Sequence, residues 1–140
     1  MSEARRYVWA SLVVESDMAL PELPRSRRAG RPDIVVRRAV RRAAAAGGRR
    51  HQWRLPDGTR WASVVSGADE HRMRFQRFAE FVVASHGRSI AWRAPAKTRP
   101  ETLRHLLLDQ VLPAVAAGHA MIGLHASAVD MDGAVAFAGP

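Results

Sequence analysis

Cysteine is absent from this sequence, so disulfide bonds, thiol catalysis and thiolate metal sites are all excluded. Long apolar runs are missing as well, since none approaches the roughly 18 residues that a membrane-spanning helix requires. The apolar stretch near the N-terminus is interrupted at Glu15 and Asp17, which is unlike a secretory signal. We therefore expect a cytoplasmic protein with no membrane partner.

Lysine is almost absent too. Lys97 is the only one, so arginine supplies nearly all of the 22 basic side chains, against 13 acidic ones. The resulting net charge of +9 is densest between Arg25 and Arg50. A basic surface is either a solvated face or a contact for phosphate or acidic peptides. We favour the solvated face, because arginine beside alanine-rich runs is a common compositional bias, and the role of segment 25–50 stays open.

The first 97 residues indicate a β-rich portion. Tyr7–Val14 is rich in β-branched and aromatic residues, which favours a strand, and the two prolines of Leu20–Pro24 predict an extended connection. Ile34–Ala46 is ambiguous, because its β-branched start favours a strand and its alanine run a helix. Two further strands are predicted within residues 52–65, on either side of the turn at Pro56–Gly58.

Residues 71–92 allow two interpretations. In the first, the chain continues as a meander of three strands. In the second, residues 71–85 form one amphipathic helix that ends before Gly87. The strands of the meander would be His71–Phe75, Phe78–Ala84 and Ser89–Trp92, whereas the inward side chains of the helix would be Met73, Phe78 and Phe81.

The clearest helix of the chain begins near Pro100. Thr98 is the predicted N-cap, and Pro100 and Glu101 suit the first helical turn. Pro113 predicts a kink and Gly118 the end of the helix. The apolar face at helical spacing consists of Leu103, Leu106, Leu107, Val111, Leu112 and Val115.

Two apolar runs follow the helix and predict an antiparallel hairpin. Ala120–Val129 and Ala134–Ala138 flank an Asp-Gly turn at residues 130–133, and we expect the hairpin to pack under the helix. The predicted fold is α/β, with an α+β N-terminal part. Its divisions are a β-rich portion over residues 1–97 and a helix with the first strands of a second core over residues 98–140.

The C-terminal third carries a recognisable order of motifs. LHASAV spans Leu124 to Val129, Gly133 follows, and VAFAG ends at Gly139. This order resembles the HPr kinase/phosphorylase-like family of phosphoenolpyruvate-carboxykinase-type P-loop kinases, in which a leucine-rich helix and these two strands precede the phosphate-binding loop. SDMALPEL, Ser16–Leu23, also looks like the opening of HPr kinase-like proteins from peptide-modification gene clusters.

The resemblance implies an ATP- and Mg²⁺-dependent serine kinase that acts on a protein or peptide phosphoacceptor. His125 would be its catalytic residue, and Gly139 and Pro140 would begin the nucleotide-binding loop; a buried histidine bonded to backbone is the alternative for His125. The second glycine, lysine and Ser/Thr of that loop do not follow. We therefore expect an N-terminal fragment of such a kinase, inactive and without cofactor by itself.

A function from a different class stays open as the alternative. The chain could be a non-catalytic basic β-rich module that binds an acidic peptide or nucleic acid, with nucleic acid less favoured. No metal site is expected, because the spacing of His105, His119 and His125 fits no common zinc pattern. The sequence identifies neither the phosphoacceptor nor the oligomeric state, and a homo-oligomer remains open.

Overall fold

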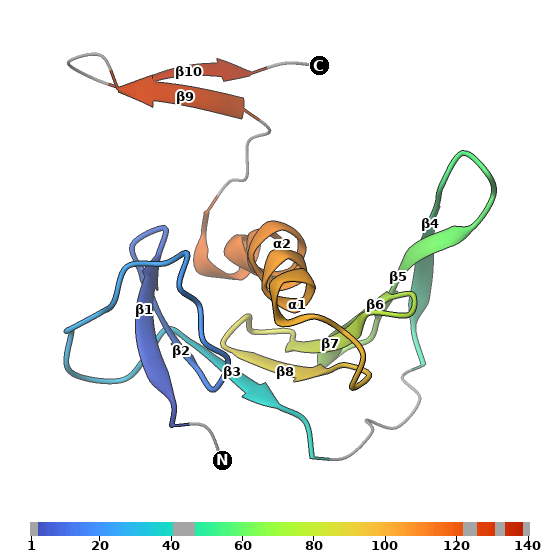
Figure 1. Cartoon of the computed structure of the whole chain (residues 1–140), viewed down its shortest axis with the longest axis horizontal. Helices are drawn as coiled ribbons and strands as arrows, with labels where there is room; N and C mark the ends of the chain where they lie inside the picture. The colour runs from blue at the N-terminus through green and yellow to red at the C-terminus, as the bar shows by residue number, and fades with distance from the viewer. Residues whose placement is uncertain (1–2, 41–46, 122–125, 131–133, 139–140) are drawn as a thin grey trace.

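The computed structural model describes residues 3–40, 47–121, 126–130 and 134–138 of the chain. An eight-stranded sheet dominates it, one interrupted helix crosses a face of that sheet, and a two-stranded hairpin follows (Figure 1). The fold is therefore mixed and dominated by β-structure, as the β-rich N-terminal portion predicted. His125, Gly139 and Pro140 lie outside the described residues.

The strand order of the large sheet is β1-β2-β3-β8-β7-β6-β5-β4. The pairs β2–β3 and β3–β8 are parallel, and the other neighbouring pairs are antiparallel. The chain thus builds β4 to β8 as a meander that returns its last strand to the free side of β3. The strands are β1 (Arg5–Trp9), β2 (Leu12–Ser16), β3 (Ile34–Arg38), β4 (Arg49–Arg54), β5 (Arg60–Ser66), β6 (Glu70–Phe75), β7 (Ala79–Ala84) and β8 (Ser89–Arg93).

The connection after β2 is packed as expected, but the predicted extended course is wrong: the Leu23 N–H donates to the Leu20 carbonyl at 3.2 Å and closes a turn through Pro21 and Glu22. Leu20 is fully buried, and its backbone N–H donates to the Tyr7 hydroxyl at 3.0 Å. Asp17 ends β2 and accepts hydrogen bonds from the Trp92 indole at 2.9 Å and from the Arg38 backbone N–H at 2.6 Å. These two hydrogen bonds connect the end of β2 to β3 and to β8.

The ambiguous segment at Ile34 forms a strand over Ile34–Arg38, and residues 41–46 lie outside the described part. Ile34 and Val36 are fully buried on the side of the sheet that faces the helix. Val35 between them is half-buried on the other side. This segment pairs in parallel with β2 on one side and β8 on the other. The burial that this pairing provides favours a strand, so the helical alternative is wrong for these residues.

The meander interpretation of residues 71–92 is confirmed, and the amphipathic helix is wrong. The alternating burial along β7 leaves Phe81 and Val83 inside and Glu80 and Val82 half-exposed between them. That period of two belongs to a strand. Phe78 lies in the turn before β7 and is 40% exposed. The helix interpretation placed it inward, and the meander interpretation placed it at the start of a strand.

The predicted helix begins at Pro100, and its apolar face is buried as expected. The prediction of Thr98 as the N-cap was wrong. Arg99 occupies the N-cap position and forms no side-chain capping bond. The Thr98 hydroxyl instead donates to the Phe78 carbonyl at 2.8 Å. The helix consists of α1 (Pro100–Leu106), the π-helical turn η1 (Leu107–Val111), α2 (Leu112–Ala116) and the 3₁₀ turn η2 (Ala117–His119).

The interruption of the helix precedes Pro113. A proline has no N–H to donate and its ring crowds the carbonyl four residues earlier, here Asp109 in η1. The wider π turn relieves that contact, so the predicted kink takes the form of a π-bulge. The helix runs one residue beyond Gly118 to His119, and Ala120 adopts the left-handed φ of 55°.

The predicted hairpin forms with β9 (Ala126–Asp130) and β10 (Ala134–Ala138) as an antiparallel pair. Its first strand starts later than predicted, because Ala120 lies in a turn and Met121 has no regular structure. The hairpin is a two-stranded sheet of its own, separate from the eight-stranded sheet, and its packing under the helix stays a prediction.

Candidate functional site

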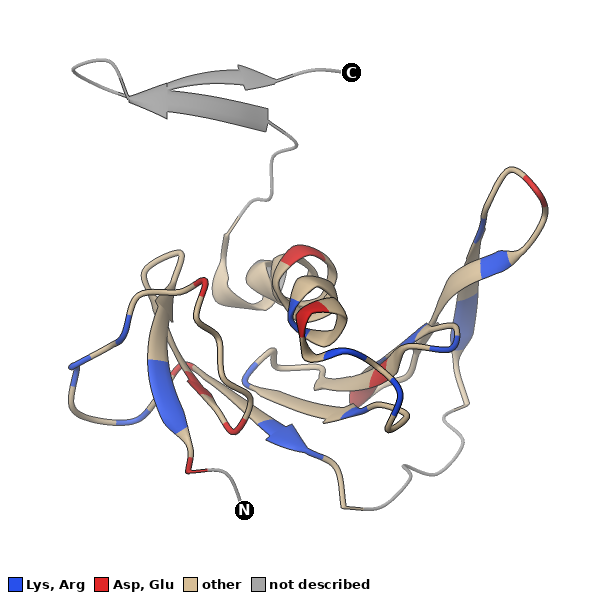
Figure 2. Cartoon of the chain, viewed as in Figure 1, with Lys and Arg blue, Asp and Glu red and all other residues tan. Residues whose placement is uncertain are grey.

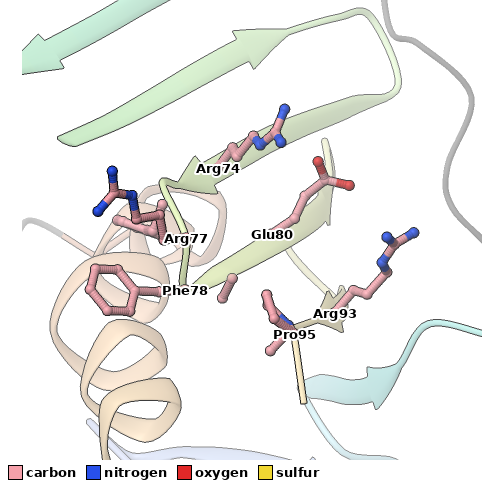
Figure 3. Close-up of a pocket in the computed structure, with 9 residues that line it drawn as sticks. Arg74, Arg77, Phe78, Glu80, Arg93 and Pro95 are labelled. Atoms are coloured by element: carbon pink, nitrogen blue, oxygen red, sulfur yellow. The ribbon is translucent and has the colours of Figure 1, made fainter. Parts of the chain in front are cut away.

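A pocket of about 350 Å³ opens beside the β6–β7 turn. The volume falls within the range of about 300–1,000 Å³ that ligand sites occupy. Figure 3 shows its charged side chains arising from three neighbouring strands and the turn. The residues that line it are Arg74, Phe75, Arg77, Phe78, Ala79, Glu80, Arg93, Ala94 and Pro95.

Strand register sets the charges of the pocket in a row. Arg74 on β6 lies directly opposite Glu80 on β7, and Glu80 lies directly opposite Arg93 on β8. Opposed residues on neighbouring strands point to the same face of a sheet. All three side chains therefore belong to the face away from the helix, and Glu80 stands between the two arginines.

Within the described chain, the pocket arginines have no protein partner, as is also true of several exposed arginines elsewhere, such as Arg27 and Arg50. Arg74, Arg77 and Arg93 are exposed, and among the described residues none of them forms an ion pair or a side-chain hydrogen bond. Glu80 is half-buried and likewise has no partner within that part of the chain. The pocket thus holds three guanidinium groups and one carboxylate with free hydrogen-bonding capacity.

The β6–β7 turn that forms the rim is held in place from two sides. Arg77 adopts a left-handed φ of 67°, which turns the chain sharply between the strands. The Phe78 carbonyl accepts the bond from Thr98, so the turn is fastened to the segment before α1. Trp61 lies edge-on to Phe78 with ring centroids 6.4 Å apart, and this contact supports the ring.

A second charged cluster on the same sheet face is already satisfied internally. Glu15 accepts from Arg6 at 2.9 Å and forms an ion pair with Arg37, and both bonds stabilise its ionised form. Hydrogen bonds from Arg6 and then Arg37 hold the pKa of Glu15 below its ordinary value of 4.5. This cluster joins β1, β2 and β3 and has a structural role.

Protonation of Glu15 should therefore weaken the fold in acid. The depressed pKa means that the ionised group stabilises the protein above about pH 4.5, and that this contribution is lost as the pH falls through the folded-state pKa. Glu15→Gln should cost on the order of 1 kcal/mol of unfolding free energy at pH 7 and much less at pH 3. Urea unfolding at both pH values measures this; Glu3→Gln, at an exposed position, is the control, and an equal cost at both pH values would contradict it.

The Arg-rich segment 25–50 is partly structural. The Arg25 guanidinium lies 4.9 Å from the centre of the Tyr7 ring, Arg28 donates to the Ser11 carbonyl at 3.0 Å, and Arg38 lies 5.5 Å from the centre of the Trp92 ring. Figure 2 shows the basic residues of the described chain spread over several strands and loops.

Two of the three histidines considered for a metal site have other partners. His119 contacts the Gly87 carbonyl at 2.9 Å, and His105 pairs with Asp109 at 2.6 Å on the exposed side of the helix. Within residues 3–40, 47–121 and the two hairpin strands, no group of three or more His, Asp or Glu is placed to hold a metal ion. None of the described helices is long and apolar enough to cross a bilayer.

Comparison of the chain with protein-family models, with curated proteins and with solved structures finds no match.

Proposed function

We propose that the chain is the N-terminal portion, with the first core strands, of an HPr kinase-like ATP-dependent serine kinase that modifies a protein or peptide. One observation carries the proposal. The helix over residues 100–119 is followed by an antiparallel hairpin, and the second strand of that hairpin, Ala134–Ala138, leads directly into Gly139. A short apolar strand that ends at a glycine is the approach to a phosphate-binding loop.

The register of the hairpin supports the proposed role of His125. Ala126, the first residue of β9, pairs with Ala138, the last residue of β10. His125 precedes Ala126 in the sequence, and Gly139 follows Ala138. In the proposed role, the imidazole of His125 donates a hydrogen bond to a phosphate oxygen or to the acceptor group.

The 140 residues do not themselves fit a complete nucleotide site. When bound, ATP and Mg²⁺ would supply the phosphoryl group and the neutralising charge. Gly139 and Pro140 are all that this sequence holds of the loop, without its lysine or its magnesium-binding hydroxyl. We propose that this portion supplies Gly139 and His125 to the nucleotide site, and that residues after Pro140 supply the rest of the phosphate-binding loop.

The 140-residue polypeptide should consequently bind ATP·Mg²⁺ negligibly. Most of the loop N–H groups and the lysine that hold the β- and γ-phosphates are missing from it. Calorimetric titration with ATP and Mg²⁺ should show no saturable heat up to millimolar nucleotide. A micromolar dissociation constant would show that another part of these residues binds the nucleotide, and would contradict the proposal that residues after Pro140 supply the rest of the loop.

The decisive test of the proposal is the coding sequence that follows Pro140. The proposal requires a second glycine, then lysine and serine or threonine, followed by phosphoryl transfer from ATP in the full gene product. A stop codon directly after Pro140 in an expressed gene would overturn it. That outcome would favour the alternative, a non-catalytic basic β-rich module.

A further inference from the structure

We propose that the pocket beside the β6–β7 turn binds an acidic peptide segment. Its glutamate or aspartate side chains would pair with Arg74, Arg77 and Arg93, while a peptide N–H would donate to Glu80. The site lies in the β-rich portion, so the proposal stands whether or not the chain belongs to a kinase.

The free arginines are the first argument for this ligand. Where an arginine of this sheet face lies beside a glutamate elsewhere, the two pair: Arg6 and Arg37 both bind Glu15. Arg74 and Arg93 instead stand on either side of one carboxylate without contacting it. A guanidinium offers a planar fork of donors that matches a carboxylate or phosphate in two parallel bonds.

Glu80 decides between a peptide and a nucleic acid. A half-buried carboxylate in the middle of the pocket repels phosphate groups, which would have to pass close to it to reach both Arg74 and Arg93. A peptide carries backbone N–H donors between its acidic side chains. It can therefore satisfy the carboxylate and the arginines together, which a uniformly negative backbone cannot do.

The apolar part of the pocket favours a peptide with an apolar side chain among its acids. Phe78 is 40% exposed at the rim, and Ala94 and Pro95 form part of the lining. Trp61 and the Thr98 hydroxyl hold the turn in place, so the Phe78 ring has a fixed position at the rim of the pocket. An aromatic ring of this kind buries apolar area at a small entropic cost on binding.

The experiment uses a fluorescein-labelled peptide with several glutamates around one leucine, and measures its binding to the 140-residue chain by fluorescence anisotropy at physiological salt. The triple variant Arg74→Gln, Arg77→Gln, Arg93→Gln should weaken binding at least about tenfold, because charge-assisted bonds are lost. The matched control Arg27→Gln, Arg49→Gln, Arg50→Gln removes the same charge from exposed sites outside the pocket. It should weaken binding less than about threefold, because salt screens charges beyond roughly 8 Å.

Two further arms separate the ligand classes. A labelled single-stranded oligonucleotide of equal charge should bind more weakly than the peptide. Glu80→Gln should lower the affinity for the peptide and raise that for the oligonucleotide. The proposal is overturned if the peptide does not bind, if both triple variants weaken binding equally, or if the oligonucleotide binds more tightly. Thermal melts of each variant verify that it is folded.

Discussion

In the full gene product, His125→Ala is expected to lower the rate of phosphoryl transfer by roughly 10²- to 10⁴-fold, the usual effect of removing a positioned proton-transfer or electrostatic group. The physical reason is that Ala126 and Ala138, which are the sequence neighbours of His125 and Gly139, pair at one end of the hairpin. Steady-state kinetics with ATP and the peptide or protein acceptor measure the effect.

A matched variant separates the chemistry of His125 from its contribution to packing. His125→Asn keeps a neutral hydrogen-bond donor of similar reach but cannot carry a proton at neutral pH. Recovery of activity in this variant would assign a hydrogen-bonding role, and continued loss a role in proton transfer or charge. If His125→Ala instead lowers the melting temperature and leaves turnover intact, the residue is a buried structural histidine.

Local chemistry made much of the fold predictable. The Pro-Asp-Gly turn at residues 56–58 is confirmed between β4 and β5, where the Asp57 carboxylate accepts from the Thr59 N–H at 2.8 Å. The apolar spacing of the helix and the two apolar runs that form β9 and β10 were equally informative. In each case the residues that decide the structure are neighbours in the sequence.

The non-local features could not be predicted in this way. The parallel pairing of β3 with β8 joins segments about fifty residues apart, and no residue in either strand identifies its partner. The pocket depends on that pairing order, since only strand register brings Arg74, Glu80 and Arg93 into one row. In the sequence they are separate charges on separate strands, which explains why they were missed.

Thr98 and two arginines show a second reason why local sequence patterns do not predict every side-chain contact. Threonine before Pro100 is a sound N-cap candidate, yet its hydroxyl bonds the Phe78 carbonyl across the fold, because that carbonyl needs a donor where the turn meets the helix. Arg25 and Arg38 likewise lie against aromatic rings that the sequence places far from them. When a side chain could make several different contacts, the tertiary structure determines which one it makes. A local sequence pattern does not show which of these contacts is the most favourable.

Phe81→Ala is expected to destabilise the chain by about 3–5 kcal/mol, the usual cost of removing a buried phenylalanine ring. Phe81 is fully buried in the middle of β7, with Met73 and Trp92 opposite it on the neighbouring strands. The ring also meets Phe75 edge-on, with centroids 6.1 Å apart. Since a small domain has only about 5–15 kcal/mol in total, the melting temperature should fall by at least about 10 °C.

Phe78→Ala is the matched control, because it removes the same ring from a position three residues away that is 40% exposed. Its cost should stay below about 1 kcal/mol, since little cavity forms at a half-open site. An amphipathic helix over residues 71–85 would bury both rings and make the two costs similar. Thermal melts of the two variants therefore test the strand assignment itself, and equal losses of stability would contradict the meander on which the register of the arginine pocket depends.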